Sequence, residues 1–275
     1  GMIYLLLLTL PLLISPQEYG SRMPINGNAY ARSLKYSKQQ GRSIGGIETK
    51  PHAWPWMVQL VQWGGHTCGG SLIDRSFVVT AAHCVDDVSP SQLKIYTGGH
   101  NSKTGQEHKV LNISVHPLYD VIMSMSYDFA IIKISPPVTF NETIQSISLP
   151  LLPPLNNQMC VVAGWGRTSE RGRPSMVLRE IQVPIIPTYE CNNFFHYAGS
   201  IDPVSMMCAG IMRGGIGACH GDSGGPLMCE RAGKWELQVG SGLMGKGCAR
   251  PDYPAVYARV LSAIPFIKFS MFRLR

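Results

Sequence analysis

Several features are missing from this sequence of 275 residues, and each absence narrows what the protein can be. It has no pair of cysteines separated by two residues, the spacing that structural zinc sites commonly use. It has no internal repeat and no low-complexity tract, which argues against a solenoid or a largely disordered chain. Its longest apolar run covers residues 3–14, whereas a helix that spans a membrane needs about 20 residues.

Positive charge is concentrated in the first part of the chain. Residues 1–42 hold one acid, Glu18, and account for +4 of the formal net charge of +7. Their basic side chains are Arg22, Arg32, Lys35, Lys38 and Arg42. The rest of the chain carries only +3, so we expect no nucleic acid as a partner.

The chain begins with a segment that is typical of export. The apolar run at residues 3–14 follows Met2 and gives way to polar Ser15-Pro16-Gln17, the pattern of a secretory signal peptide. We assign residues 1–15 to this signal, with its end between 15 and 20, and predict a secreted, extracellular protein with no membrane span. Residues 16–42 are polar and aperiodic, as in segments that proteases cut readily.

The cysteine count fits the same compartment. Eight cysteines in an exported chain predict four disulfides, although their spacing alone leaves the pairing open. Asn112 and Asn141 each begin an N-x-S/T sequon, so we also predict a glycoprotein.

From Trp54 onward, short apolar runs recur between turn signals. Val110–Val115 alternates between apolar and polar residues, as a half-buried strand does. Many such strands predict an all-β fold. The exception is a helix over residues 262–272, which would need Pro265 in its first turn.

Three separate strings carry side chains suited to nucleophilic catalysis. Ser223 lies in GDSGGP (221–226), where glycines permit a tight turn that aims amide N–H groups at one point. His83 lies in TAAHC (80–84), and imidazole readily accepts and returns a proton near neutral pH. Asp128 begins DFAIIKI (128–134), where a buried carboxylate can fix the tautomer of a histidine.

In the order His, Asp, Ser, these strings resemble those of the chymotrypsin/trypsin family of serine proteases. The similarity runs from about residue 43 to the C-terminus and includes CGGSLI (68–73), AGWG (163–166) and PAVY (254–257). It implies an all-β fold of two six-stranded antiparallel β-barrels with a short C-terminal helix. It also implies an activation propeptide at 16–42 and a protease domain at 43–275.

The resemblance also implies roles for individual residues. His83, Asp128 and Ser223 would form the catalytic triad, and the N–H groups of Gly221 and Ser223 the oxyanion hole. The implied disulfides are Cys68–Cys84, Cys160–Cys229, Cys191–Cys208 and Cys219–Cys248. The resemblance implies no cofactor and no metal for catalysis. We also expect no bound calcium, because Gly99 stands where the family's calcium loop carries a glutamate.

Activation in this family begins with a cut before an Ile-Val-Gly-Gly-like sequence. Here Arg42 precedes Ser43, so a trypsin-like protease would release the Ser43 amine to pair with Asp222. Ser43 replaces a branched apolar residue, a loss of roughly 1–3 kcal/mol of burial energy. Before the cut, the resemblance assigns His66 to hold Asp222.

Two further departures from the family lie in Gly242-Leu243-Met244-Gly245, where its members usually have Val-Ser-Trp-Gly. Leu243 replaces a serine whose hydroxyl donates to the triad aspartate, and the lost hydrogen bond could lower turnover about 10–100-fold. Met244 replaces a rigid tryptophan wall with a flexible side chain.

The specificity pocket is expected to be uncharged. Gly217 stands where trypsin-like members place an aspartate, with Gly245 and Ala255 at the matching wall and floor positions. We therefore predict cleavage after apolar residues rather than after Lys or Arg.

Two functions remain open from the sequence. One is a monomeric serine endopeptidase, made as a zymogen, that acts on proteins or peptides and is subject to protein protease inhibitors. The other is a weakly active or inactive binding protein on a protease scaffold. An α/β-hydrolase would place its histidine after the serine, and His83 precedes Ser223.

Overall fold

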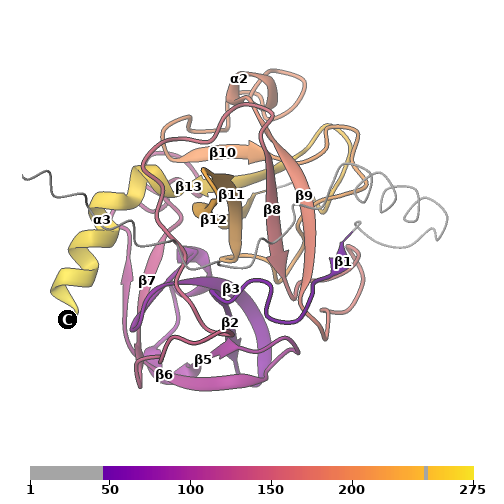
Figure 1. The fold of residues 1–275 in the computed structure, drawn as a ribbon. Helices are drawn as coiled ribbons and strands as arrows, with labels where there is room; N and C mark the ends of the chain where they lie inside the picture. Colours follow the sequence, from indigo (N-terminus) through magenta and orange to yellow (C-terminus); the bar gives the residue numbers. More distant parts are fainter. Residues whose placement is uncertain (1–45, 245–246) are drawn as a thin grey trace, which may run out of the picture.

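A computed structural model describes residues 46–244 and 247–275 of the chain, which form two β-rich halves that pack side by side (Figure 1). The predicted signal peptide and propeptide, together with Arg42, Ser43 and Gly245, lie outside the described residues.

The first half is a closed barrel of six antiparallel strands in the order β2-β3-β4-β7-β6-β5. The strands are β2 (Met57–Gln62), β3 (Gly65–Asp74), β4 (Phe77–Thr80), β5 (Leu93–Gly98), β6 (Gly105–Val115) and β7 (Ala130–Ser135). Their inward side chains, such as Leu60, Leu72, Ile95 and Ile131, are fully buried in one core. The alternation predicted for Val110–Val115 is broken by a register shift between Val110 and Asn112, which leaves Leu111 54% exposed.

The second half is a seven-stranded sheet that curls back on itself, because β8 pairs with both β9 and β11. Its strands are β1 (Ile47–Glu48), β8 (Met159–Gly164), β9 (Arg179–Ile186), β10 (Met206–Ala209), β11 (Pro226–Arg231), β12 (Lys234–Met244) and β13 (Ala255–Arg259). The short β1 pairs with β9 at the edge of the sheet.

Helices are few among the described residues. The short helix α2 (Thr188–Cys191) lies in the second half, and α3 (Val260–Arg273) follows β13 and packs on the first barrel. A contact between Ser114 Oγ and Ser270 Oγ (3.1 Å) joins this barrel to α3. The helix begins at Val260 rather than at 262, so Pro265 lies beyond its first turn, contrary to the prediction. In the part of the chain that the structure describes, no helix has the length and apolar character to cross a membrane.

The all-β fold class is therefore confirmed. Four disulfides cross-link the described residues, and their pairs are those that the resemblance implies. They join Cys68 to Cys84, Cys160 to Cys229, Cys191 to Cys208 and Cys219 to Cys248. The first lies within the barrel formed by β2–β7, and the other three lie within the second half.

The two halves make a close backbone contact where β3 meets the loop before β11. The Gly69 N–H donates to the Ser223 carbonyl (2.7 Å). A Cβ on Gly69 would lie 2.9 Å from the Cα of Gly225, so only glycine permits this approach. The seam between the halves thus fixes the backbone from the Ser223 carbonyl to Gly225.

Candidate active site

His83 and Asp128 form a hydrogen-bonded pair at the seam. His83 lies in a short 3-10 helix (Ala82–Cys84) just after β4, and its Nδ1 is 2.7 Å from Asp128 Oδ2. Because an ionised carboxylate can only accept, Nδ1 carries the proton in this contact. In the neutral ring Nε2 is then the nitrogen that can accept a proton. Its neighbour is Cys84 Sγ at 3.7 Å, a disulfide sulfur with no proton to donate, and within the described residues no hydrogen bond joins Nε2 to Ser223 Oγ. The His83 side chain is 26% exposed, so part of the ring can be reached from outside.

Asp128 is held so that both its oxygens are used. It is 1% exposed and stands two residues before β7. Its Oδ1 accepts the backbone N–H of His83 (2.9 Å), while Oδ2 accepts the ring N–H. One carboxylate therefore fixes both the main chain and the imidazole of His83.

Ser223 lies in a turn that glycines make possible. Gly221 and Gly224 have φ values of +94° and +77°, a region that other residues rarely adopt. A Cβ on Gly224 would lie 2.2 Å from Thr80 Oγ1 and 3.2 Å from the Ala81 nitrogen. The residue after Ser223 thus packs against the segment that leads into His83. The structure brings the loop of the serine and the His83–Asp128 pair to the same seam.

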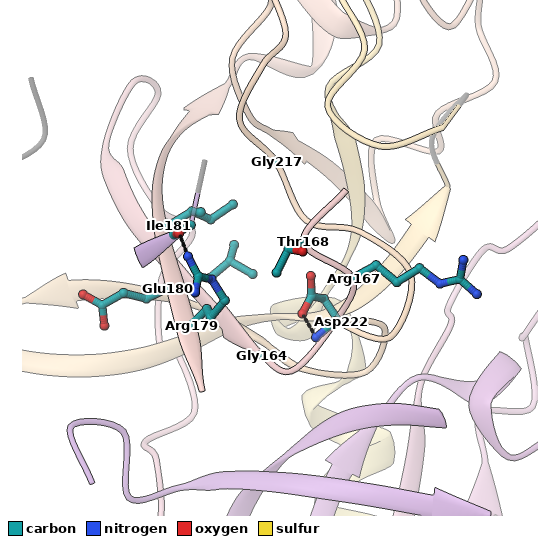
Figure 2. A pocket seen from close by; sticks show the side chains of 11 residues that line it. Gly164, Arg167, Thr168, Arg179, Glu180, Ile181, Gly217 and Asp222 are labelled. Atoms are coloured by element: carbon teal, nitrogen blue, oxygen red, sulfur yellow. Dashed lines mark hydrogen bonds between the residues drawn. The ribbon is translucent and has the colours of Figure 1, made fainter. Parts of the chain in front are cut away.

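Asp222 is a partly buried residue whose carboxylate lies beside a hollow (Figure 2). Its Oδ1 accepts the Gly166 N–H (2.8 Å) and its Oδ2 accepts the Cys219 N–H (2.9 Å). Burial nevertheless dominates and raises the pKa of Asp222 to about 6. No cation contacts this carboxylate among the described residues. A positive charge placed in the hollow would therefore stabilise the ionised form of Asp222 and lower its pKa.

The mouth and walls of this hollow include Gly46, Thr168 and Ile181. Figure 2 shows Thr168 near Asp222, whereas Arg167 and Glu180 point away from the hollow. The Arg179 guanidinium donates to the Gly46 carbonyl and so holds Gly46 beside the hollow.

The resemblance gave the AGWG string no role, and the structure supplies one for its glycines. A Cβ on Gly164 would lie 2.2 Å from Asp222 Oδ1, and a Cβ on Gly166 would lie 2.5 Å from the same atom. Trp165 between them is buried and donates from Nε1 to the His100 carbonyl (3.0 Å). The string therefore forms the wall against which the Asp222 carboxylate packs.

We predict that Gly166→Ala lowers the free energy of unfolding by about 1–3 kcal/mol, because the added methyl group overpacks the wall. Urea denaturation of the precursor, made inactive by Ser223→Ala, measures this. Gly65→Ala is the matched control, since its Cβ would have only an ordinary contact at 3.6 Å and should change stability by less than about 0.5 kcal/mol. Equal effects of the two substitutions would contradict the steric account.

His66 does not hold Asp222 as expected. Its Nε2 donates to the Gly221 carbonyl (2.7 Å), and its Nδ1 accepts from the Gln59 amide (3.0 Å). Burial lowers the pKa of His66, which favours this neutral tautomer. Both ring nitrogens are thus used, and His66 fixes the peptide that follows Gly221.

The predicted specificity residues Gly217 and Ala255 line a second hollow, with Ala218, Ala249 and Pro254 among its other walls. A Cβ on Gly217 would lie 3.2 Å from the Cβ of Ala249, so a side chain here would need that neighbour to move. Met244 pairs with Val256 through the backbone of β12, and the positions of the Leu243 and Met244 side chains are not described.

One group of potential metal ligands occurs within the described ranges: Cys68, His83 and Cys84. Its two cysteines form a disulfide, so their sulfurs are not thiolate ligands. At Gly99, a Cβ would lie 2.2 Å from the Thr104 carbonyl oxygen, so the glutamate of a calcium loop does not fit this backbone.

Comparison with known families agrees with this geometry. A protein-family model described as Trypsin matches residues 43–267, a range that includes His83, Asp128, Asp222 and Ser223.

Proposed function

The chain belongs to the trypsin family of serine proteases, and on that premise we propose that it is a secreted serine endopeptidase, made as a zymogen, whose catalytic triad is His83, Asp128 and Ser223. The observation that carries the proposal is the 2.7 Å contact between His83 Nδ1 and Asp128 Oδ2 beside the Ser223 loop. This contact leaves Nε2 as the proton acceptor that a serine nucleophile requires.

The proposed reaction proceeds through an acyl-enzyme. Ser223 Oγ attacks the substrate carbonyl carbon while His83 Nε2 takes the hydroxyl proton, and the Gly221 and Ser223 N–H groups stabilise the oxyanion. The C–N bond then breaks as His83 gives its proton to the leaving amine. Water, deprotonated by His83, next attacks the ester, and Ser223 regains its proton as the acid product leaves.

A fluorophosphonate probe tests the proposal directly. We expect the probe to label the chain after treatment with trypsin, and Ser223→Ala to abolish labelling. Absence of labelling in a correctly cleaved and folded chain would refute the protease and favour a binding protein on the same scaffold.

The hollow beside Asp222 supports activation by cleavage after Arg42. Gly46 lines this hollow with Asp222, and Ser43 precedes Gly46 by three residues, a reach of about 10 Å. In this proposal the Ser43 amine enters the hollow and pairs with the buried carboxylate, which orders the Gly221–Ser223 loop. Trypsin treatment followed by sequencing of the new terminus should give Ser43.

Secretion is part of the proposal. Four disulfides are typical of oxidising compartments, and both sequon residues, Asn112 and Asn141, are exposed and so accessible to glycosylation. The proposed partners are protein or peptide substrates, an activating trypsin-like protease and protein protease inhibitors.

We predict that peptide-library cleavage occurs after Leu, Met, Phe or Tyr, because Gly217 places no carboxylate in the pocket to bind a cation. Without a carboxylate in this pocket, the enzyme would also not cleave after Arg42 and so would not activate itself. A library profile dominated by Lys and Arg would contradict this specificity.

A further inference from the structure

A small hairpin beside the candidate active site presents three exposed arginines. An antiparallel bridge between Arg167 and Pro174 closes this segment, which we call the arginine hairpin (residues 167–174). Arg167, Arg171 and Arg173 are all exposed. Across the described ranges, none of the three forms an ion pair with an acidic side chain.

The one acid of the hairpin is already used. Glu170 accepts from Arg250 at 2.8 Å, and this contact ties the hairpin to the segment after Cys248. A Cβ on Gly247 would lie 2.3 Å from both Glu170 Oε1 and Arg250 Nε, so glycine leaves room for the pair. The Glu170 carboxylate is therefore not available to neutralise the three arginines.

The hairpin is joined to the loop of the proposed nucleophile. The Arg167 N–H donates to the His220 carbonyl (2.8 Å), and the neighbouring Gly166 N–H donates to Asp222. His220 directly precedes Gly221, one of the proposed oxyanion donors. Figure 2 shows the Arg167 side chain pointing away from the hollow beside Asp222, where it leaves room for an inserted terminus.

From this placement we propose that the arginine hairpin is a substrate-binding rim that recognises acidic residues on one side of the scissile bond. The inference deepens the proposed protease function and depends on it. Guanidinium groups bind carboxylates with two parallel hydrogen bonds, and exposed ones do so without the cost of burying a charge. In this proposal a rim joined to the loop before Gly221 reads acids on one flank of the scissile bond, while the pocket at Gly217 reads the residue before that bond.

An acidic peptide fits better than a long polyanion. The three cations occupy a single short hairpin, and the chain after residue 42 carries only +3. Polyanion sites spread many cations over an extended face.

Matched fluorogenic peptides test the rim. All carry Leu before the scissile bond. Each has either acidic Asp-Glu-Asp or neutral Asn-Gln-Asn at three positions, placed before the Leu in one pair of peptides and after the scissile bond in the other pair. For one flank we expect the acidic peptide to show roughly tenfold higher kcat/KM than its neutral partner at low ionic strength. The ratio of the two values should approach one in 0.5 M NaCl, because salt screens exposed charges. The double variant Arg171→Glu/Arg173→Glu should remove or invert the preference.

The matched control is Lys109→Glu/Lys234→Glu, which makes the same change in net charge at two exposed lysines. Lys109 pairs with Ser135, at the end of β7 that is far from Asp128. Lys234 begins β12 and pairs with Arg231, at the end of the β11–β12 pair that is far from Ser223. This control should keep the preference and the rate of fluorophosphonate labelling.

A binding measurement on an inactive variant tests the rim even if the proposed protease activity is absent. Fluorescence anisotropy with Ser223→Ala needs no turnover, and the acidic peptide should bind about tenfold more tightly than the neutral one unless the arginines are reversed. Equal binding of both peptides, or a preference that survives the reversal, overturns the rim. It is also overturned if the reversal abolishes retention on heparin without changing the peptide preference.

Discussion

Replacing Asp128 with asparagine is expected to lower kcat by about 10⁴-fold. Asp128 accepts the ring N–H of His83 at 2.7 Å, which leaves His83 Nε2 unprotonated. An asparagine whose oxygen still accepts the His83 backbone N–H would turn its amide N–H₂ toward Nδ1. The imidazole would then carry its proton on Nε2, where it could not accept one from Ser223.

The comparison uses trypsin-cleaved proteins whose amounts are matched by absorbance. Asp87→Asn is the control, because Asp87 is an exposed acid four residues after His83 and should leave kcat within twofold. The effect should appear in kcat rather than in KM, since the lost interaction acts on proton transfer. A fall of less than tenfold for Asp128→Asn would show that Asp128 does not control the His83 tautomer.

The recurring short strands predicted the all-β fold class, and the strings around His83 and Ser223 singled these two residues out. The string around Asp128 is not distinctive alone, and Asp128 became a candidate only through its partners. The contact between His83 and Asp128 joins residues 45 positions apart and could be expected only through the family resemblance. Similarly, the cysteine spacing left the pairing open, and the family supplied it.

Other features could not be predicted because they depend on backbone positions that no local pattern encodes. Gly164 and Gly166 look like ordinary turn residues until Asp222 is placed against them. The register shift in β6 leaves Leu111 exposed while Ile113 and Val115 still pack against the core of the barrel, so the alternation predicted the half-buried strand but not the exposure of Leu111. His66 was assigned to Asp222 by analogy, but Gln59 and Gly221 occupy its two nitrogens.

The second large effect concerns Asp222 in the uncleaved precursor. Burial raises the pKa of this carboxyl from an ordinary 3.8 to about 6. A raised folded-state pKa means that the folded protein holds this proton more tightly than the unfolded chain does. The associated stability is present below about pH 4 and is lost as the pH rises through 6, a total of about 3 kcal/mol. Insertion of the Ser43 ammonium would favour the charged carboxylate and remove this loss.

We therefore expect the Ser223→Ala precursor to lose about 2 kcal/mol of unfolding free energy between pH 4.5 and 7.5 relative to the same chain carrying Asp222→Asn, which cannot ionise there. Urea denaturation at each pH measures the difference, and trypsin cleavage should abolish it. In the chain that retains Ser223, Asp222→Asn should lower kcat/KM after cleavage by about 10²–10³-fold, the cost of breaking a buried charge pair. The Asp87→Asn control should show neither effect. If cleaved Asp222→Asn kept full activity, the proposed pairing of Ser43 with Asp222 would be wrong, although the triad assignment would stand.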